Sequence, residues 1–141
     1  MIDLLVASHL DYLANTKNVF SDAWDKNMLV SGMEKGGLRG FVYTENGKNL
    51  GYITYSFSFE TADIECVFVE KEHRGKGIAK SLIERAISDL KEKGVSKILL
   101  EVRSSNERAK ALYKRAGFNE ISKRKNYYDG IEDALIFLKE I

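Results

Sequence analysis

The chain has no proline, a single cysteine and almost no net charge. A lone Cys66 cannot form an intramolecular disulfide, and no cysteine and histidine cluster has the spacing of a zinc site, so we expect no metal. With 22 basic and 21 acidic residues, the formal net charge of +1 provides no general attraction to nucleic acid or to an anionic membrane. No apolar run approaches the ~20 residues that cross a bilayer, and the N-terminus lacks a basic leader. We therefore expect a soluble, cytoplasmic protein.

The composition indicates one globular domain that comprises residues 1–141, of which 44% are hydrophobic and 30% charged. A chain of this length can bury roughly two-thirds of the surface that it exposes when unfolded. The sequence contains no repeat, low-complexity segment or linker that would divide it. We expect a monomer or a weak dimer.

Hydrophobic periodicity predicts short elements in the N-terminal half, punctuated by glycine, asparagine, aspartate and serine. The predicted elements are a strand over Ile2–Val6, a helix capped by Ser8, a helix over Ala23–Lys35, and strands over Leu38–Thr44, Asn49–Phe59 and Ile64–Val69. The Asn46-Gly47 pair favours a tight hairpin between the second and third of these strands. Gly36 and Gly37 can end the second helix in a left-handed conformation.

The C-terminal half contains the clearest helix, because apolar residues from Ile78 to Leu90 recur every three or four positions until Gly94. The other predicted elements are a strand over Lys97–Arg103, a helix capped by Ser104 and Glu107 that ends before Gly117, and strands over Phe118–Arg124 and Ala134–Lys139. A strand, a helix and a second strand in succession predict a parallel pair with a right-handed crossover. The order of elements predicts an α+β fold with one central mixed sheet.

The run Arg74-Gly75-Lys76-Gly77-Ile78-Ala79 has the composition of a phosphate-binding loop. Its two glycines allow consecutive backbone N–H groups to face one anion, and the next helix presents its unpaired N-terminal donors to the same place. An anionic cofactor is the expected ligand. A glycine turn with solvated basic residues is the structural alternative. A dinucleotide-binding loop fits poorly, because Lys80 stands where a third glycine is needed.

Arg74-x-x-Gly77-x-Ala79 resembles the Arg/Gln-x-x-Gly-x-Gly/Ala motif of the GNAT acetyltransferases. The segment Leu100–Phe118, with Leu-Glu-Val-Arg-x-Ser-Asn and Leu-Tyr-x-x-x-Gly-Phe, resembles the bacterial ribosomal-protein-alanine N-acetyltransferases, the RimI-type group. Asn126-Tyr127-Tyr128 followed by Glu132-Asp133-Ala134 is similar to that group's C-terminal motif. The resemblance covers about Ile64–Leu138. It implies the GNAT (acyl-CoA N-acyltransferase) fold, with a mostly antiparallel sheet and helices on both faces.

The resemblance also implies acetyl-CoA as the co-substrate. In a GNAT-like fold, the strand containing Val67, Phe68 and Val69 diverges from its parallel neighbour, and its free backbone groups pair with the pantetheine amides. The expected CoA-binding residues are Val67, Phe68, Val69, Arg74, Gly75, Lys76, Gly77, Ile78, Ala79, Lys80 and Asn106.

The carboxylate of Glu101 lies within an apolar strand, where it lowers the stability of the fold unless it forms an ion pair or takes part in catalysis. It can take the proton of an amine whose pKa is ~7.7–8.0. We expect Glu101 to act as general base and Tyr113 as general acid toward the leaving thiolate, as the family resemblance implies. Glu65 is a rival base. An acetylated Cys66 is a weaker alternative because buried cysteines are commonly inert.

For the acceptor, the resemblance implies that Tyr127 and Tyr128 contact the backbone of an extended protein N-terminus, with a ribosomal protein as candidate. Phe20–Trp24 departs from the group's Phe-Pro-Trp-Ser pattern and is expected on the acceptor side. The structural alternatives remain an ion pair for Glu101 with Arg103 or a lysine, and ordinary packing for the tyrosines. Functional alternatives are acetylation of a lysine or small amine, and a noncatalytic CoA-sensing module.

Overall fold

The computed structural model describes residues 1–141 as one seven-stranded sheet in the order β1-β2-β3-β4-β5-β7-β6. The strands are β1 (Ile2–Leu4), β2 (Leu38–Glu45), β3 (Lys48–Ser58), β4 (Thr61–Val69), β5 (Lys97–Arg103), β6 (Asn119–Tyr128) and β7 (Glu132–Glu140). The α-helices are α1 (Leu10–Asn15), α2 (Lys26–Glu34), α3 (Ile78–Glu92) and α4 (Glu107–Arg115). Short 3-10 helices are η1 (Ala7–His9), η2 (Thr16–Asn18) and η3 (Lys71–His73).

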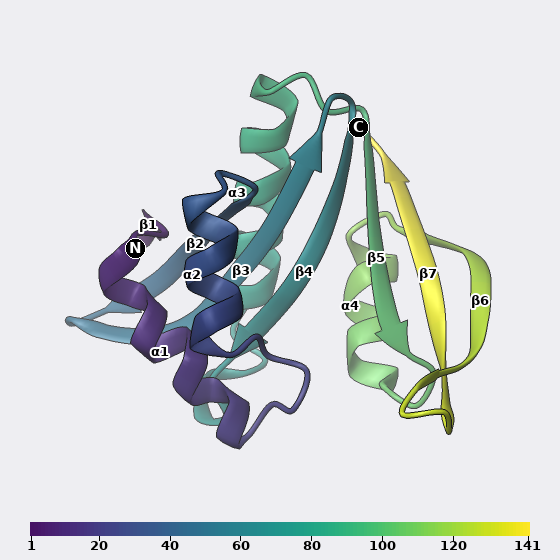
Figure 1. The fold of residues 1–141 in the computed structure, drawn as a ribbon, viewed down its shortest axis with the longest axis horizontal. Helices are drawn as coiled ribbons and strands as arrows, with labels where there is room; N and C mark the ends of the chain where they lie inside the picture. Colours follow the sequence, from purple (N-terminus) through teal and green to yellow (C-terminus); the bar gives the residue numbers. More distant parts are fainter.

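Helices cover both faces of the sheet, with α1 and α2 on one face and α3 and α4 on the other (Figure 1). A core of 20 buried residues lies beneath α3 and α4, and a second cluster of nine lies beneath α1 and α2. No helix is both long and apolar enough to cross a membrane. The predicted α+β architecture with a mixed, mostly antiparallel sheet is therefore confirmed.

The strongest local signals correspond to the observed elements. α3 buries Leu82, Ile83, Ala86 and Leu90 on one face, as its periodicity predicts. The hairpin between β2 and β3 turns at Asn46 and Gly47, where the φ angles of 52° and 77° fit the tight turn that Asn-Gly favours. These segments fold as predicted because the signals come from adjacent residues.

Three predicted helix starts are wrong. The side chain of Asp25 accepts a hydrogen bond from the Met28 N–H, so α2 begins after Asp25 rather than at Ala23. Asn106, not Ser104, caps α4 by accepting from the Ala109 N–H at 3.1 Å. Ser8 lies inside η1 and makes no capping bond. For α2 and α4, a neighbouring residue offers the better-placed acceptor.

β4 and β5 form the only parallel pair, and four of the nine residues of β4 take part in it. The register joins Thr61 to Lys97 and ends where Ile64 lies opposite Leu100. Beyond that point the two strands separate, as Figure 1 shows. β7 inserts beside β5 and separates it from β6, although β6 precedes β7 in the chain. The separation leaves the second half of β4 with a free edge in the middle of the sheet.

Candidate active site

A cavity of about 450 Å³ lies where β4 and β5 separate. It is lined by Asp22, Trp24, Asp63, Ile64, Glu65, Leu99, Leu100, Glu101, Arg124, Tyr127, Tyr128 and Ile136. The structure thus brings the candidate bases Glu65 and Glu101 together with the candidate acceptor contacts Tyr127 and Tyr128. The lining contains four acidic side chains and one arginine, and this excess of negative charge suits a cationic group such as an ammonium.

Glu65 and Glu101 face the groove from neighbouring strands and differ in environment. Burial raises the pKa of Glu65, a hydrogen bond from Ser56 at 2.9 Å opposes this, and the charges of Asp63 and Glu101 raise it further. Glu101 is more exposed and lies 3.1 Å from the guanidinium of Arg124. The ion pair of Glu101 is therefore with Arg124, not with Arg103 or a lysine. Both carboxylates remain candidate bases on this geometry.

Tyr113 is not among the residues that line the groove; it lies on α4, which covers the face of the sheet opposite α1 and α2. Its ring packs edge-to-face against Phe118 and Phe137, with centroids 5.9 and 6.4 Å away. Burial raises the pKa of Tyr113, and the nearby Cys66 and Tyr128 raise it further. The phenol therefore stays protonated at neutral pH, as a proton donor requires. The structure does not place Tyr113 in contact with Glu101.

Tyr127 and Tyr128 lie at the end of β6, where its pairing with β7 is irregular. Their rings are nearly perpendicular, with centroids 5.2 Å apart. The guanidinium of Arg124 lies 5.3 Å from the Tyr127 ring centroid, and that of Arg103 lies 4.1 Å from the Tyr128 ring centroid. These cation-π contacts fix two aromatic rings at the rim of the groove.

The predicted phosphate loop has the backbone geometry of an anion cradle. Gly75 and Gly77 have φ angles of 80° and 83°, which side-chain-bearing residues rarely adopt. Gly77 caps α3 without a side-chain hydrogen bond, so no side chain occupies the N-terminal N–H groups of the helix. Lys76 and Lys80 are exposed beside them. The loop can therefore present main-chain donors and positive charge to one anion.

Two expected cofactor residues have structural partners in this conformation. The Arg74 Nε donates a hydrogen bond to the carbonyl of Val69 at 2.9 Å, which joins the loop to the end of β4. Asn106 is exposed, and its side-chain oxygen caps α4. A role of either residue in CoA binding stays a prediction.

The backbone of Val67, Phe68 and Val69 pairs with β3 on one side only. Val69 lies opposite Gly51, and Val67 lies opposite Ile53. On the side that faces β5, the ladder has already ended. This free edge runs from the groove toward the phosphate loop, and an extended ligand can pair with it as an additional strand would.

The thiol of Cys66 is buried and unsuited to nucleophilic attack. Burial raises its pKa to about 11, so the thiolate is scarce at neutral pH. No group of three or more histidine, cysteine, aspartate or glutamate side chains could hold a metal ion. The groove thus offers carboxylates and a strand edge rather than an activated thiolate.

Some lining residues were missed by sequence reasoning. Asp63 and Glu65 are two positions apart on a strand and so share a face, a signal that could have identified Asp63. Arg124 was not assigned to the site by any sequence pattern. Asp22 and Trp24 were expected on the acceptor side as a segment, without individual roles. Their positions depend on contacts with residues distant in the sequence.

The sequence matches the acetyltransferase (GNAT) family over residues 7–118. The chain therefore belongs to the GNAT family and is an acetyltransferase, as the motifs around Gly77 and Glu101 predicted. Among its relatives, it is 34% identical to the ribosomal protein bS18-alanine N-acetyltransferase of Escherichia coli K12 over 95% of this chain and 88% of that one.

Two further comparisons agree. The putative ribosomal protein bS18-alanine N-acetyltransferase of Bacillus subtilis is 33% identical over 83% of this chain and 79% of its own. The crystal structure of the ribosomal-protein-S18-alanine N-acetyltransferase from Escherichia coli superposes with a TM-score of 0.90 at 30% identity. It covers 100% of this chain and 93% of that one. The predicted resemblance to the ribosomal-protein-alanine group is confirmed.

Proposed function

We propose that the protein transfers the acetyl group of acetyl-CoA to the N-terminal α-amino group of a protein, with a ribosomal protein as acceptor. The observation that supports this most directly is the acidic groove that adjoins the free edge of β4. The free edge of β4 offers main-chain groups for an extended cofactor arm, and the carboxylates of Glu65 on β4 and Glu101 on β5 are available to an amine. The names of the related enzymes agree with this acceptor.

Acetyl-CoA fits the chain as a substrate along two features. The N–H groups at the start of α3, with Lys76 and Lys80, bind its diphosphate. The backbone of Val67–Val69 pairs with its pantetheine amides and directs the thioester into the gap between β4 and β5.

The groove then deprotonates and positions the amine. An α-amino group has a pKa of ~7.7–8.0, so a carboxylate can accept its proton at modest cost, directly or through water. Glu101 is the proposed base, and Glu65 is the rival. The freed lone pair attacks the thioester carbonyl, the carbon–sulfur bond breaks, and the thiolate takes its proton from Tyr113.

Acceptor selection rests on the rim of the groove. The acidic lining attracts the ammonium of a protein N-terminus. The rings of Tyr127 and Tyr128 limit where the rest of the acceptor backbone can lie. Transfer is direct, in a ternary complex, because the protonated Cys66 is a poor acyl carrier. A monomer or weak dimer in the cytoplasm remains the expected state.

Three synthetic peptides test the proposal. The first begins with a free alanine and lacks lysine, the second is the same peptide with a blocked N-terminus, and the third is blocked but carries a lysine. We expect mass spectrometry to find acetyl transfer to the first peptide only. Transfer to the third alone would assign a lysine acetyltransferase, and cofactor binding without turnover on any amine would indicate a sensing module.

A further inference from the structure

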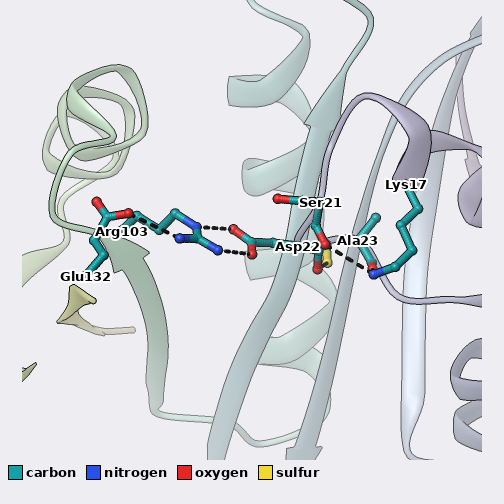
Figure 2. Close-up of polar contacts among 7 residues, drawn as sticks. Lys17, Ser21, Asp22, Ala23, Arg103 and Glu132 are labelled. Carbon is teal, nitrogen blue, oxygen red and sulfur yellow. Dashed lines mark hydrogen bonds and ion pairs between the residues drawn. The ribbon is translucent and has the colours of Figure 1, made fainter. Parts of the chain in front are cut away.

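Asp22 and Arg103 form an ion pair across the gap between β4 and β5, although 81 residues separate them (Figure 2). Arg103 ends β5, and Asp22 lies in the segment between η2 and α2. The Nε of Arg103 donates to Asp22 Oδ2 at 2.8 Å, and Nη2 donates to Oδ1 at 2.8 Å. This two-point geometry fixes orientation as well as distance.

The guanidinium of Arg103 also binds Glu132, at the start of β7. Its Nη1 donates to Glu132 Oε1 at 3.1 Å, and Glu132 Oε2 accepts the N–H of Ser105 at 2.9 Å. The hydrogen bonds from Ser105 lower the pKa of Glu132 to about 2, so this carboxylate is charged at physiological pH. These contacts connect the segment between η2 and α2 to β5 and β7. We call Asp22, Arg103 and Glu132 the bridging triad.

The segment around Asp22 is also fixed from the other side. Lys17 Nζ donates to the carbonyls of Ser21 at 3.1 Å and Ala23 at 2.9 Å (Figure 2). The thiol of Cys66 on β4 donates to the carbonyl of Asp22 at 3.8 Å. The segment is therefore connected to both strands that border the gap.

The bridging triad is better shielded than an ordinary surface pair. The side chains of Arg103 and Asp22 are 26% and 36% exposed, whereas those of Lys26 and Asp11 in another ion pair are 58% and 76% exposed. Arg103 additionally stacks on Tyr128, which lines the groove from the end of β6, whereas Trp24 lines it from the segment before α2. A partly desolvated, bidentate contact holds its two side chains in a fixed relative position more strongly than an exposed contact does.

We propose that the bridging triad sets the distance between the two walls of the groove, one containing Trp24 and the other Tyr128, and so positions the acceptor. This inference rests on the proposed function. Asp22 and Arg103 are positioning residues, because neither is placed against the reacting atoms. Breaking the bridge widens the groove, so the acceptor amine is bound less often in the geometry required for attack.

The test compares Asp22→Ala with Asp11→Asn, which breaks the exposed Lys26–Asp11 pair as a matched control. For Asp22→Ala, we expect the KM for the free-alanine peptide to rise about tenfold, with the KM for acetyl-CoA unchanged. Arg103→Lys keeps the charge but cannot form the two-point contact, so it should show the same pattern. Melting temperatures establish that each variant is folded under the assay conditions.

A second readout needs no acceptor. Trp24 is the only tryptophan of the chain and lines the groove two residues from Asp22. Acrylamide should quench its fluorescence more strongly in Asp22→Ala and Arg103→Lys than in the unaltered chain or Asp11→Asn. Quenching that matches the control, or an unchanged acceptor KM in an active enzyme, overturns the inference. If the unaltered chain acetylates no free N-terminus, the proposed function fails, and the quenching still decides whether the bridging triad positions the wall.

Discussion

The guanidinium of Arg124 lies 3.1 Å from the carboxylate of Glu101, and the arginine is the more exposed partner, at 57% against 33%. The contact occupies one face of the proposed base with a positive charge from the chain itself. An acceptor ammonium that approaches Glu101 competes with this guanidinium for the carboxylate.

Removing the charge of Arg124 should ease acceptor binding. We expect Arg124→Gln to lower the KM for the free-alanine peptide by about two- to fivefold, the scale of an exposed ion pair. Steady-state kinetics at constant acetyl-CoA measures this. Lys123→Gln, the preceding position on β6, controls for the general loss of positive charge. A higher acceptor KM in Arg124→Gln would mean that the arginine binds the acceptor instead of competing with it.

Glu101→Gln should lower turnover by about 100- to 10,000-fold while leaving the affinity for acetyl-CoA nearly unchanged, because the amide cannot accept the amine proton. Glu65→Gln is the matched variant, since it removes the other carboxylate that faces the same groove. We expect it to have the smaller effect on kcat. The opposite order would move the role of base to Glu65, whose raised pKa already suits it to accept a proton.

The phosphate loop can be tested with two glycines of equal strain. Gly77 and Gly47 have φ angles of 83° and 77°, and an added Cβ meets nothing within 4 Å at either position. Alanine at either should lower the free energy of unfolding by about 1–2 kcal/mol. Only Gly77→Ala should weaken acetyl-CoA binding, by roughly tenfold in calorimetric titration, since only Gly77 orients the N–H groups of α3. Equal affinity in both variants would remove the loop from the cofactor site.

How well each part of the fold could be predicted depends on how far apart in the sequence its contacting residues lie. α3 and the Asn46-Gly47 turn could be predicted because a helical face and a tight turn are encoded within a few residues. The insertion of β7 between β5 and β6 could not, since no local signal records which strand pairs with Lys97–Arg103. The helix starts at Asp25 and Asn106 were missed where several neighbouring residues could form the cap.

The candidate site also has parts that the sequence could predict and parts that it could not. The loop around Gly77 and the carboxylate of Glu101 stand out because of their residue types against an apolar or glycine-rich background. The pairing of Asp22 with Arg103 depends on how a loop folds over the gap between two strands, so the sequence around either residue does not predict it. The packing of Tyr113 against Phe118 and Phe137 depends likewise on the placement of α4, which the helix pattern alone does not specify.

The hydrogen bonds of Asp89 make the free energy of unfolding depend on pH. Its carboxylate accepts hydrogen bonds from Arg39 at 3.0 Å and Tyr55 at 2.6 Å, which connects α3 to β2 and β3. Burial alone would raise the pKa of Asp89, but the hydrogen bonds from Arg39 and Tyr55 outweigh it and the net shift is downward. This stabilisation is therefore present above the unfolded-state pKa of about 3.9 and is lost as the pH falls through the lower folded-state value.

Asp89→Asn should accordingly lower the free energy of unfolding by about 1–3 kcal/mol at neutral pH. Urea titrations of both proteins should show that the difference shrinks in acid. Asp11→Asn, at an exposed ion pair, should change stability little at any pH. A deficit of the same size in acid would show that the charge of Asp89 is not what stabilises the fold.

The most direct measurement of the central claim is the acetylation state of protein N-termini in cells that contain the enzyme and in cells that lack it. We expect mass spectrometry to find one or a few N-termini, ribosomal proteins among them, that are acetylated only in the presence of the enzyme, and restoration by the unaltered chain but not by Glu101→Gln. N-termini that are identical in both cells, with differences confined to lysines or small amines, would contradict it.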